Sequence, residues 1–194
     1  MSVEYVKKAL NESAQLKLKV ADLLSKQIAT VASELSKSLK AGGKAIFCGN
    51  GGSAADSQHL ATELVVRLTS KNNRQALAAI SLTTNSSIIT ACGNDYGFDQ
   101  IFSRQIEALG QKGDILFAIS TSGNSKNIIN AVCDAKDKGL VSVGLLGCDG
   151  GKLAGLVNHP LIIPSDDVQR IQESHIAIGH IIISIVENNL FSNR

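Results

Sequence analysis

Over the first forty residues, apolar side chains recur every three or four positions, and neither glycine nor proline occurs among them. This spacing predicts a helical arm over residues 2–40, with a possible break near Ser25, because such side chains share one face of a helix. Gly42 and Gly43 are expected to end the helix. An arm of this length has too little core of its own, so we expect it to pack on the domain or on a partner subunit.

Beyond the arm, short apolar runs alternate with helical patterns. The runs lack polar alternation, which is typical of parallel strands that are buried on both faces. They predict strands at residues 45–48, 76–82, 115–120, 141–146 and 161–164. Helices are expected at residues 53–68, 85–91, 98–110, 125–138, 151–157 and 169–190. The sequence therefore predicts an α/β fold with a doubly wound, five-stranded parallel sheet and an N-terminal helical arm.

The composition excludes several classes of function. The 194 residues show no repeat or linker, which predicts one domain, with the arm at 1–43 and an α/β sandwich at 44–194. A net charge of only +2 and an aromatic content of 4% argue against nucleic-acid binding. No apolar run reaches the roughly 18 residues of a membrane span, and the N-terminus does not resemble a signal peptide, so we expect a cytoplasmic protein. The cysteines lack CxxC spacing and are expected to be reduced core thiols, namely Cys48, Cys92, Cys133 and Cys148.

Two strand ends are rich in glycine, serine, threonine and asparagine. The first predicted strand ends in the segment GNGGS (49–53), and the third ends in STSGNS (120–125). Ligands of parallel sheets bind at such ends, where hydroxyls and the N–H groups of the next helix can hold an anion. Neither loop is a Walker loop or a GxGxxG motif, so a phosphate or polyol ligand is favoured over a dinucleotide. Alternatively, both loops only turn the chain and cap helices, with Ser53 and Asp56 as a capping box and Ser125 as an N-cap.

The helix after the first loop carries His59 and Glu63, four residues apart and therefore on one face. A half-buried carboxylate beside an imidazole can act as a general base, and the two can also bind a metal ion. The alternative is an ordinary polar pair on a solvated helix face.

The last helix places Gln172 and His180 eight residues apart and roughly on one face, whereas His175 points to another side. His180 lies in an apolar run, and a core histidine is the alternative interpretation. Asn94 and Asp95 form a further polar turn, whose alternative interpretation is simple turn chemistry.

Taken in order, these motifs resemble the sugar isomerase (SIS) family and, within it, the phosphoheptose isomerases. The resemblance rests on GNGGSAADSQH followed by Glu63, then on GNDYGF, STSGNS, DGGK and RIQE-x-H-x4-H, and it covers nearly the whole chain. It implies conversion of D-sedoheptulose 7-phosphate into D-glycero-D-manno-heptose 7-phosphate through an enediol, for the heptose of lipopolysaccharide. It also implies a homotetramer with active sites at subunit interfaces.

The resemblance further implies roles for individual residues. Glu63 would be the base, and His180 the acid that serves the ring or carbonyl oxygen. The phosphate would be held by Ser120, Thr121, Ser122 and Ser125. Other substrate contacts would come from Asn50, Gly51, Gly52, Ser53, Glu63, Asn94, Asp95 and Gln172. One zinc ion per subunit would be bound by His59, Glu63, Gln172 and His180. A zinc ion on Glu63 would lower the basicity of that carboxylate, so the role of the metal stays open: it could stabilise the interface, polarise the substrate carbonyl, or do both.

Two other classes share parts of this pattern. A non-catalytic SIS tetramer that binds the replication initiator protein lacks the groups that match Glu63 and His180, and this chain has both. A sugar-phosphate-sensing transcriptional regulator would need a DNA-binding headpiece, and residues 1–43 lack its two short helices and basic surface. An enzyme is therefore the favoured interpretation.

Overall fold

The computed structural model describes residues 2–70 and 72–191. Its centre is a five-stranded sheet with the order β2-β1-β3-β4-β5, in which every neighbouring pair is parallel. The strands are β1 (Ala45–Gly49), β2 (Ala79–Ser81), β3 (Ile115–Ser120), β4 (Val141–Leu146) and β5 (His159–Ile162). The chain winds outward in opposite directions from β1 and β3, so the carboxyl ends of these two strands border a crevice. The predicted doubly wound fold is confirmed.

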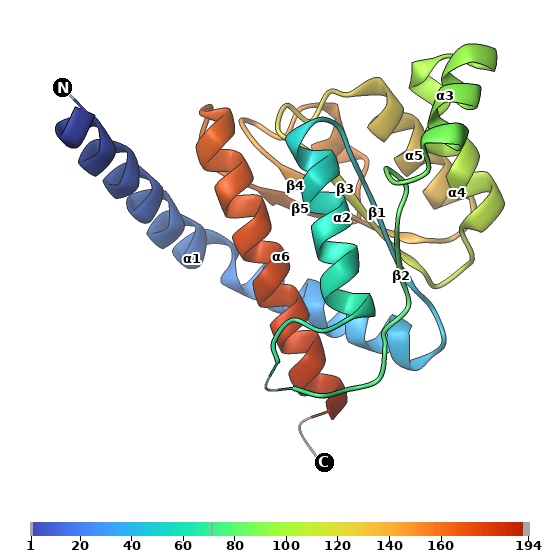
Figure 1. The fold of residues 1–194 in the computed structure, drawn as a ribbon, viewed down its shortest axis with the longest axis horizontal. Helices are drawn as coiled ribbons and strands as arrows, with labels where there is room; N and C mark the ends of the chain where they lie inside the picture. Colours follow the sequence, from blue (N-terminus) through green and yellow to red (C-terminus); the bar gives the residue numbers. More distant parts are fainter. Residues whose placement is uncertain (1, 71, 192–194) are drawn as a thin grey trace.

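Helices cover both faces of the sheet (Figure 1). One face carries α1 (Ser2–Lys40), α2 (Gly52–Val65) and α6 (Val168–Phe191). The other carries α3 (Ser86–Asp95), the 3-10 turn η1 (Phe98–Gln100), α4 (Ser103–Leu109), α5 (Lys126–Asp137) and the 3-10 turn η2 (Lys152–Gly155). In the part of the chain that the structure describes, no helix combines the length and apolarity that crossing a bilayer requires.

Side chains of successive strand residues point to opposite faces of the sheet and pack into two separate hydrophobic cores. In β1, Phe47 faces α1, α2 and α6, and its ring stacks on Phe117 of β3 with 4.8 Å between the ring centres. Ile46 and Cys48 face the opposite way, toward α4 and α5. Because both faces are buried, both sets of side chains must be apolar, which explains the unbroken apolar runs of the sequence.

The arm is one helix from Ser2 to Lys40, and the predicted break near Ser25 is absent. Its second half packs against α6 and the sheet. In its first half Ser13, Leu16 and Val20 are also buried, and the turns before them project from the domain (Figure 1). Two contacts tie this first half to the start of α6. Ser13 Oγ donates to a carboxylate oxygen of Glu173 at 2.6 Å, and Arg170 donates to the carbonyl of Ala9 at 2.7 Å.

Several predicted boundaries were wrong. The helix expected over 98–110 is divided into η1 and α4, and the segment 151–157 contains only the turn η2. β2 is paired over three residues instead of seven. β5 begins at His159, two residues earlier than predicted, because an edge strand that pairs only with β4 tolerates Pro160.

The expectation of four core thiols is half right. Cys48 and Cys92 are buried, but Cys133 and Cys148 are exposed. Burial raises the pKa of the Cys48 thiol to about 12, so this group stays protonated and unreactive.

The core histidine of α6 is His175. Its side chain is fully buried, and its Nε2 donates to the carbonyl of Leu146, at the carboxyl end of β4, at 3.1 Å. Burial lowers the pKa of His175 to about 4, although this hydrogen bond partly opposes the shift.

His175 should make the fold sensitive to mild acid. Between about pH 6.5 and 4, the unfolded chain takes up a proton that the folded chain rejects, so stability is lost as the pH falls. The pKa difference corresponds to about 3 kcal/mol of unfolding free energy across this window. Urea unfolding at several pH values should therefore show a shallower acid dependence for His175→Gln than for the wild type. If the unfolding free energies of the two proteins depended equally on pH, His175 would not be the source of the acid sensitivity.

Candidate active site

The loops that follow β1 and β3 are joined side by side at the crevice. Asn50 and Asn127 exchange two hydrogen bonds, each amide nitrogen donating to the other's oxygen at 2.9 Å. Asn127 is buried in the first turn of α5, and its only sequence signal is an amide on the apolar side of a helix. The loop after β1 is therefore tied to the first turn of α5, the helix that follows the loop after β3.

The loop after β3 leaves the beginning of α5 open to an anion. Ser125 occupies the N-cap position, but its side chain caps no N–H group of the helix, so the expected N-cap hydrogen bond is absent. Its Oγ lies 3.3 Å from Ser120 Oγ instead. N–H groups of the first helical turn and two hydroxyls thus surround a place where the helix dipole favours negative charge. Thr121 is half-buried and Ser122 is exposed on the same loop.

Gly123 allows this loop to close on its neighbour. Its φ is +63°, and a Cβ there would collide with the carbonyl of Gly150. Gly123→Ala should therefore distort the loop and raise KM for a phosphorylated substrate about tenfold or more, since strain of this kind costs about 1–3 kcal/mol. Gly155→Ala is the matched control, because a Cβ at Gly155 meets open space. Steady-state kinetics of both variants measure the effect, and equal KM values would contradict it.

The loop after β1 differs from the predicted capping box. α2 begins at Gly52 with Gly51 as N-cap and no side-chain cap, so Ser53 and Asp56 do not cap it. Ser53 is buried, and its role as a substrate contact stays a prediction. Gln172 of α6 lies against Gly52, where any Cβ would collide with its amide.

Farther along, α2 and α6 bring the predicted acid–base groups together. A Cβ at Gly179 would collide with Leu60, so this glycine permits the close approach of the two helices. His59 Nε2 and His180 Nε2 are 2.8 Å apart, and Glu63 Oε1 lies 3.6 Å from His59 Nε2. The Glu63 side chain is 16% exposed, so it is partly desolvated at the wall of the site.

The two imidazoles share one proton between their facing nitrogens. At 2.8 Å, one Nε2 must donate and the other accept, because two N–H groups would repel each other. Asp56, one turn earlier on α2, has a buried Oδ2 without a hydrogen-bond partner. Burial raises the pKa of Asp56, and the nearby His59 and His180 oppose that shift. The sequence had suggested Asp56 only as a cap, so its place beside the histidines is a finding of the structure.

The predicted zinc ligands are only partly brought together. His59, Glu63 and His180 converge, but Gln172 is eight residues before His180 on α6, about 12 Å of helical rise away, with its amide at Gly52. Within the described ranges, no group of three or more histidine, cysteine, aspartate or glutamate residues is arranged to hold a metal ion as it stands. Tetrahedral zinc would hold two nitrogens about 3.3 Å apart, so the histidine pair needs to open by only about half an ångström.

Asn94 and Asp95 are not brought to this site within one chain. They form the exposed end of α3, where Asn94 Nδ2 donates to Asp95 Oδ1 at 2.8 Å. In Figure 1, α3 lies on the opposite side of the domain from α6.

Comparison with known proteins places the chain among isomerases. A family model described as SIS domain matches residues 9–147. The phosphoheptose isomerase of Aquifex aeolicus is 49% identical over 185 residues, which are 95% of this chain and 96% of the relative. That of Paramagnetospirillum magneticum is 57% identical over 150 residues, 77% of either chain. The solved structure of phosphoheptose isomerase GmhA from Neisseria gonorrhoeae is 40% identical in sequence and has a TM-score of 0.90. The superposition covers 97% of this chain and 100% of that one.

These likenesses extend over the arm, the sheet and the helices that carry the site. They favour an enzyme over the non-catalytic SIS tetramer, in agreement with the presence of Glu63 and His180. The chain belongs to the SIS domain family and, within it, to the phosphoheptose isomerases, which makes it an isomerase of sugar phosphates.

Proposed function

We propose that this isomerase converts D-sedoheptulose 7-phosphate into D-glycero-D-manno-heptose 7-phosphate, for the heptose of lipopolysaccharide, in the cytoplasm. The observation that carries this proposal is that Glu63 and His180 converge from two different helices, in a chain whose loop after β3 leaves the start of α5 open to an anion. The names of the relatives support the seven-carbon substrate.

In the proposed reaction, the phosphate is bound by neutral donors at the start of α5. Ser120 and Ser125 contribute hydroxyls, and the uncapped N–H groups of the helix point at the phosphate oxygens. The amides of Asn50 and Gln172 lie on the neighbouring loop and helix, where they can bind sugar hydroxyls. This arrangement fixes one end of the sugar and leaves its carbonyl end free to reach α2.

The chemistry is a proton shift between adjacent carbons. The Glu63 carboxylate takes a proton from C1 while an imidazole N–H of His180 protonates the carbonyl oxygen on C2, which gives an enediol. The C1 hydroxyl then returns its proton to His180, and Glu63 delivers its proton to C2. The net result moves two hydrogens within the same sugar, from C1 and its hydroxyl to C2 and its oxygen. No electrons leave the sugar, so the reaction needs no redox cofactor. His59, at 2.8 Å from His180, holds the facing nitrogen of His180 in one orientation.

We also propose that His59, Glu63 and His180 hold a zinc ion. Gln172, the fourth predicted ligand, has its amide at Gly52 instead. Two facing imidazole nitrogens and a carboxylate are a donor set that suits zinc. When bound, the metal would polarise a substrate oxygen. Metal analysis of the purified protein measures the zinc content of the wild type and of His59→Gln, and equal contents would count against this ligand set.

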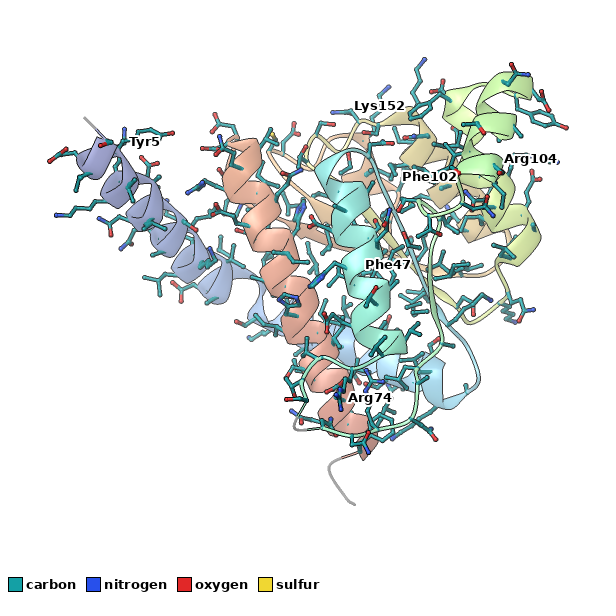
Figure 2. All side chains as sticks on the ribbon, in the orientation of Figure 1. Tyr5, Phe47, Arg74, Phe102, Arg104 and Lys152 are labelled. Atoms are coloured by element: carbon teal, nitrogen blue, oxygen red, sulfur yellow. The ribbon has the colours of Figure 1, made fainter. Side chains whose placement is uncertain are left out.

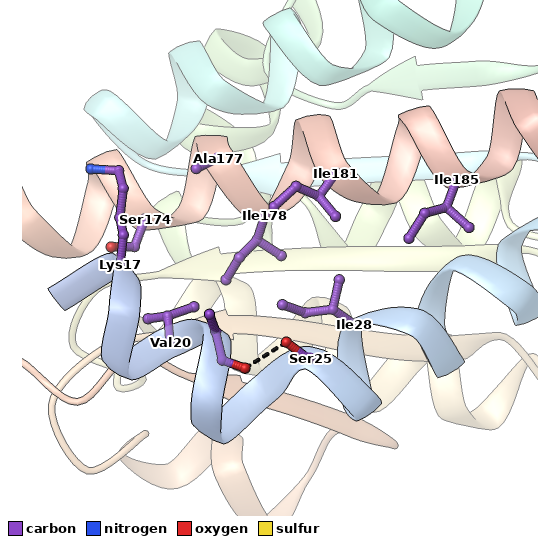
Figure 3. A pocket seen from close by; sticks show the side chains of 10 residues that line it. Lys17, Val20, Ser25, Ile28, Ser174, Ala177, Ile178, Ile181 and Ile185 are labelled. Atoms are coloured by element: carbon purple, nitrogen blue, oxygen red, sulfur yellow. Dashed lines mark hydrogen bonds between the residues drawn. The ribbon is translucent and has the colours of Figure 1, made fainter. Parts of the chain in front are cut away.

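A homotetramer with active sites at subunit interfaces is part of the proposal. A groove of about 330 Å³ runs between α1 and α6, lined largely by apolar side chains such as Val20, Ile28 and Ile181 (Figure 3). Farther along the arm, Tyr5 and Leu10 are 68% and 66% exposed. A second copy of the chain is the proposed cover for these surfaces, and the exposed Asn94 and Asp95 would then serve a neighbouring site. Sedimentation equilibrium measures the mass in solution, and a monomer would contradict this assembly.

One assay tests the substrate directly. Purified protein is incubated with sedoheptulose 7-phosphate, with and without added zinc, and the aldose product is followed. A parallel reaction with a six-carbon ketose phosphate tests the length of the substrate. Turnover of the seven-carbon sugar is expected, and its absence under both conditions would overturn the proposed function.

A further inference from the structure

The last turn of α2 is capped by a residue from the connection to β2. α2 ends at Val65, and its last turn carries no basic residue of its own. Arg74 supplies one from outside the helix (Figure 2): its Nη2 donates to the carbonyl of Glu63 at 2.7 Å, and its Nη1 donates to that of Leu64 at 2.8 Å. These are carbonyls that a helix end leaves without partners, and a cation there also suits the helix dipole.

The same guanidinium is anchored to α6. Arg74 Nε donates to Glu187 Oε1 at 2.6 Å, and the two side chains are 1% and 5% exposed. Glu187 accepts two further hydrogen bonds, from the backbone N–H of Leu68 at 3.2 Å and from Asn72 Nδ2 at 3.0 Å. Burial alone would raise the pKa of Glu187, but these donors hold it below its ordinary value, so the pair stays ionised.

Both ends of this connection lie on the helices that carry the acid–base groups. Glu63 is in the last turn of α2, the part of a helix most prone to fray. Glu187 follows His180 by seven residues, which is two turns along the same face of α6. We infer that Arg74 and Glu187 are positioning residues, which fix the Glu63-bearing turn of α2 against the His180-bearing helix and so set the distance between base and acid.

This inference rests on the proposed roles of Glu63 and His180, and its test includes a measurement that does not depend on them. Arg74→Gln, Arg74→Lys and Glu187→Gln are compared with the wild type at a temperature where all remain folded by circular dichroism. We expect kcat to fall about 10- to 100-fold in Arg74→Gln and Glu187→Gln. KM should change less than about twofold, because the phosphate loop is on another part of the sheet. Arg74→Lys keeps the charge but not the two-pronged contact, so it should recover kcat only in part.

The matched control is a half-buried ion pair that also connects two segments far apart in the chain. Lys44 Nζ lies 2.6 Å from Asp114 Oδ2, and the two side chains are 24% and 2% exposed. This pair precedes β1 and β3, at the end of the sheet opposite the site. Asp114→Asn should lower the unfolding temperature while leaving kcat and KM unchanged.

Amide hydrogen exchange supplies the independent measurement. Residues 60–66 should exchange faster in Arg74→Gln and Glu187→Gln than in the wild type or in Asp114→Asn. If kcat in both variants stays within about threefold of the wild type, or falls equally in Asp114→Asn, the positioning role is overturned. If Arg74→Gln does not fold, the same kcat and hydrogen-exchange criteria are applied to Arg74→Lys and Glu187→Gln. A wild type without isomerase activity would instead refute the proposed function, and the exchange data would still decide whether Arg74 holds the end of α2.

Discussion

Glu63→Gln should lower the kcat of the isomerase by about two to four orders of magnitude. The amide has nearly the same shape as the carboxylate but cannot take a proton from carbon, so the loss arises in the chemical step. The Glu63 carboxylate lies 3.6 Å from His59 and its side chain is 16% exposed, so the substitution removes no fully buried ion pair and we expect the fold to survive. KM should change little, because the phosphate site lies on a different loop.

Steady-state kinetics and exchange of substrate hydrogen with deuterated solvent measure this effect together. The variant should lose both turnover and solvent exchange at C1, since the same proton transfer underlies both. Glu107→Gln, at an exposed glutamate of α4 that forms an ion pair with Arg104 one turn earlier, is the control and should behave as the wild type. Retained solvent exchange in Glu63→Gln would remove its role as the base.

His180→Gln should also lower kcat by about two orders of magnitude or more, because the variant has no proton of suitable acidity for the substrate oxygen. His59→Gln should have a smaller effect if His59 only orients its partner, since a glutamine amide can still donate to or accept from an imidazole nitrogen. The two variants therefore separate the acid from its neighbour across a contact of only 2.8 Å.

A third histidine provides the control for both substitutions. His159 is half-buried at the edge of the sheet and lies 2.7 Å from Glu34 of the arm, far from α2. His159→Gln should keep the wild-type kcat. Equal losses in His180→Gln and His59→Gln, together with a loss of zinc from both, would favour a shared role as metal ligands over an acid role for His180.

The parts of the fold that local pattern controls could be predicted from the sequence. β3 and β4 begin and end where their apolar runs do, because both strands lie inside the sheet and are covered on two faces. The edge strands were predicted less well. β5 begins one residue before Pro160. Proline argues against a strand unless one side of that strand is unpaired. The strand order shows that β5 is such an edge strand, but the sequence does not.

The histidines of α6 show the same limit for the site. The sequence pattern left open whether His180 belongs to the core, but His175 is the buried one and His180 meets His59. Both lie in the same apolar segment, and the close approach of Leu60 to Gly179, which brings this side of α6 against α2, cannot be deduced from the local pattern. Arg74 carries no local signal for its role, because the partners that connect α2 to α6 lie 10 (Leu64), 11 (Glu63) and 113 (Glu187) residues away along the chain.

The unbroken course of α1 has a consequence for how the length of the arm can change. An inserted residue near Ser25 would rotate everything before it by about 100° around the helix axis. The hydrogen bonds of Ser13 to Glu173 and of Ala9 to Arg170 would then lose their partners, and these two α6 residues flank Gln172 on either side. An insertion of seven residues would nearly restore the phase, but it would move Ser13 and Ala9 about 10 Å along the axis, so both bonds would still be lost. The register of the arm on α6 therefore depends on its length as well as on its rotation.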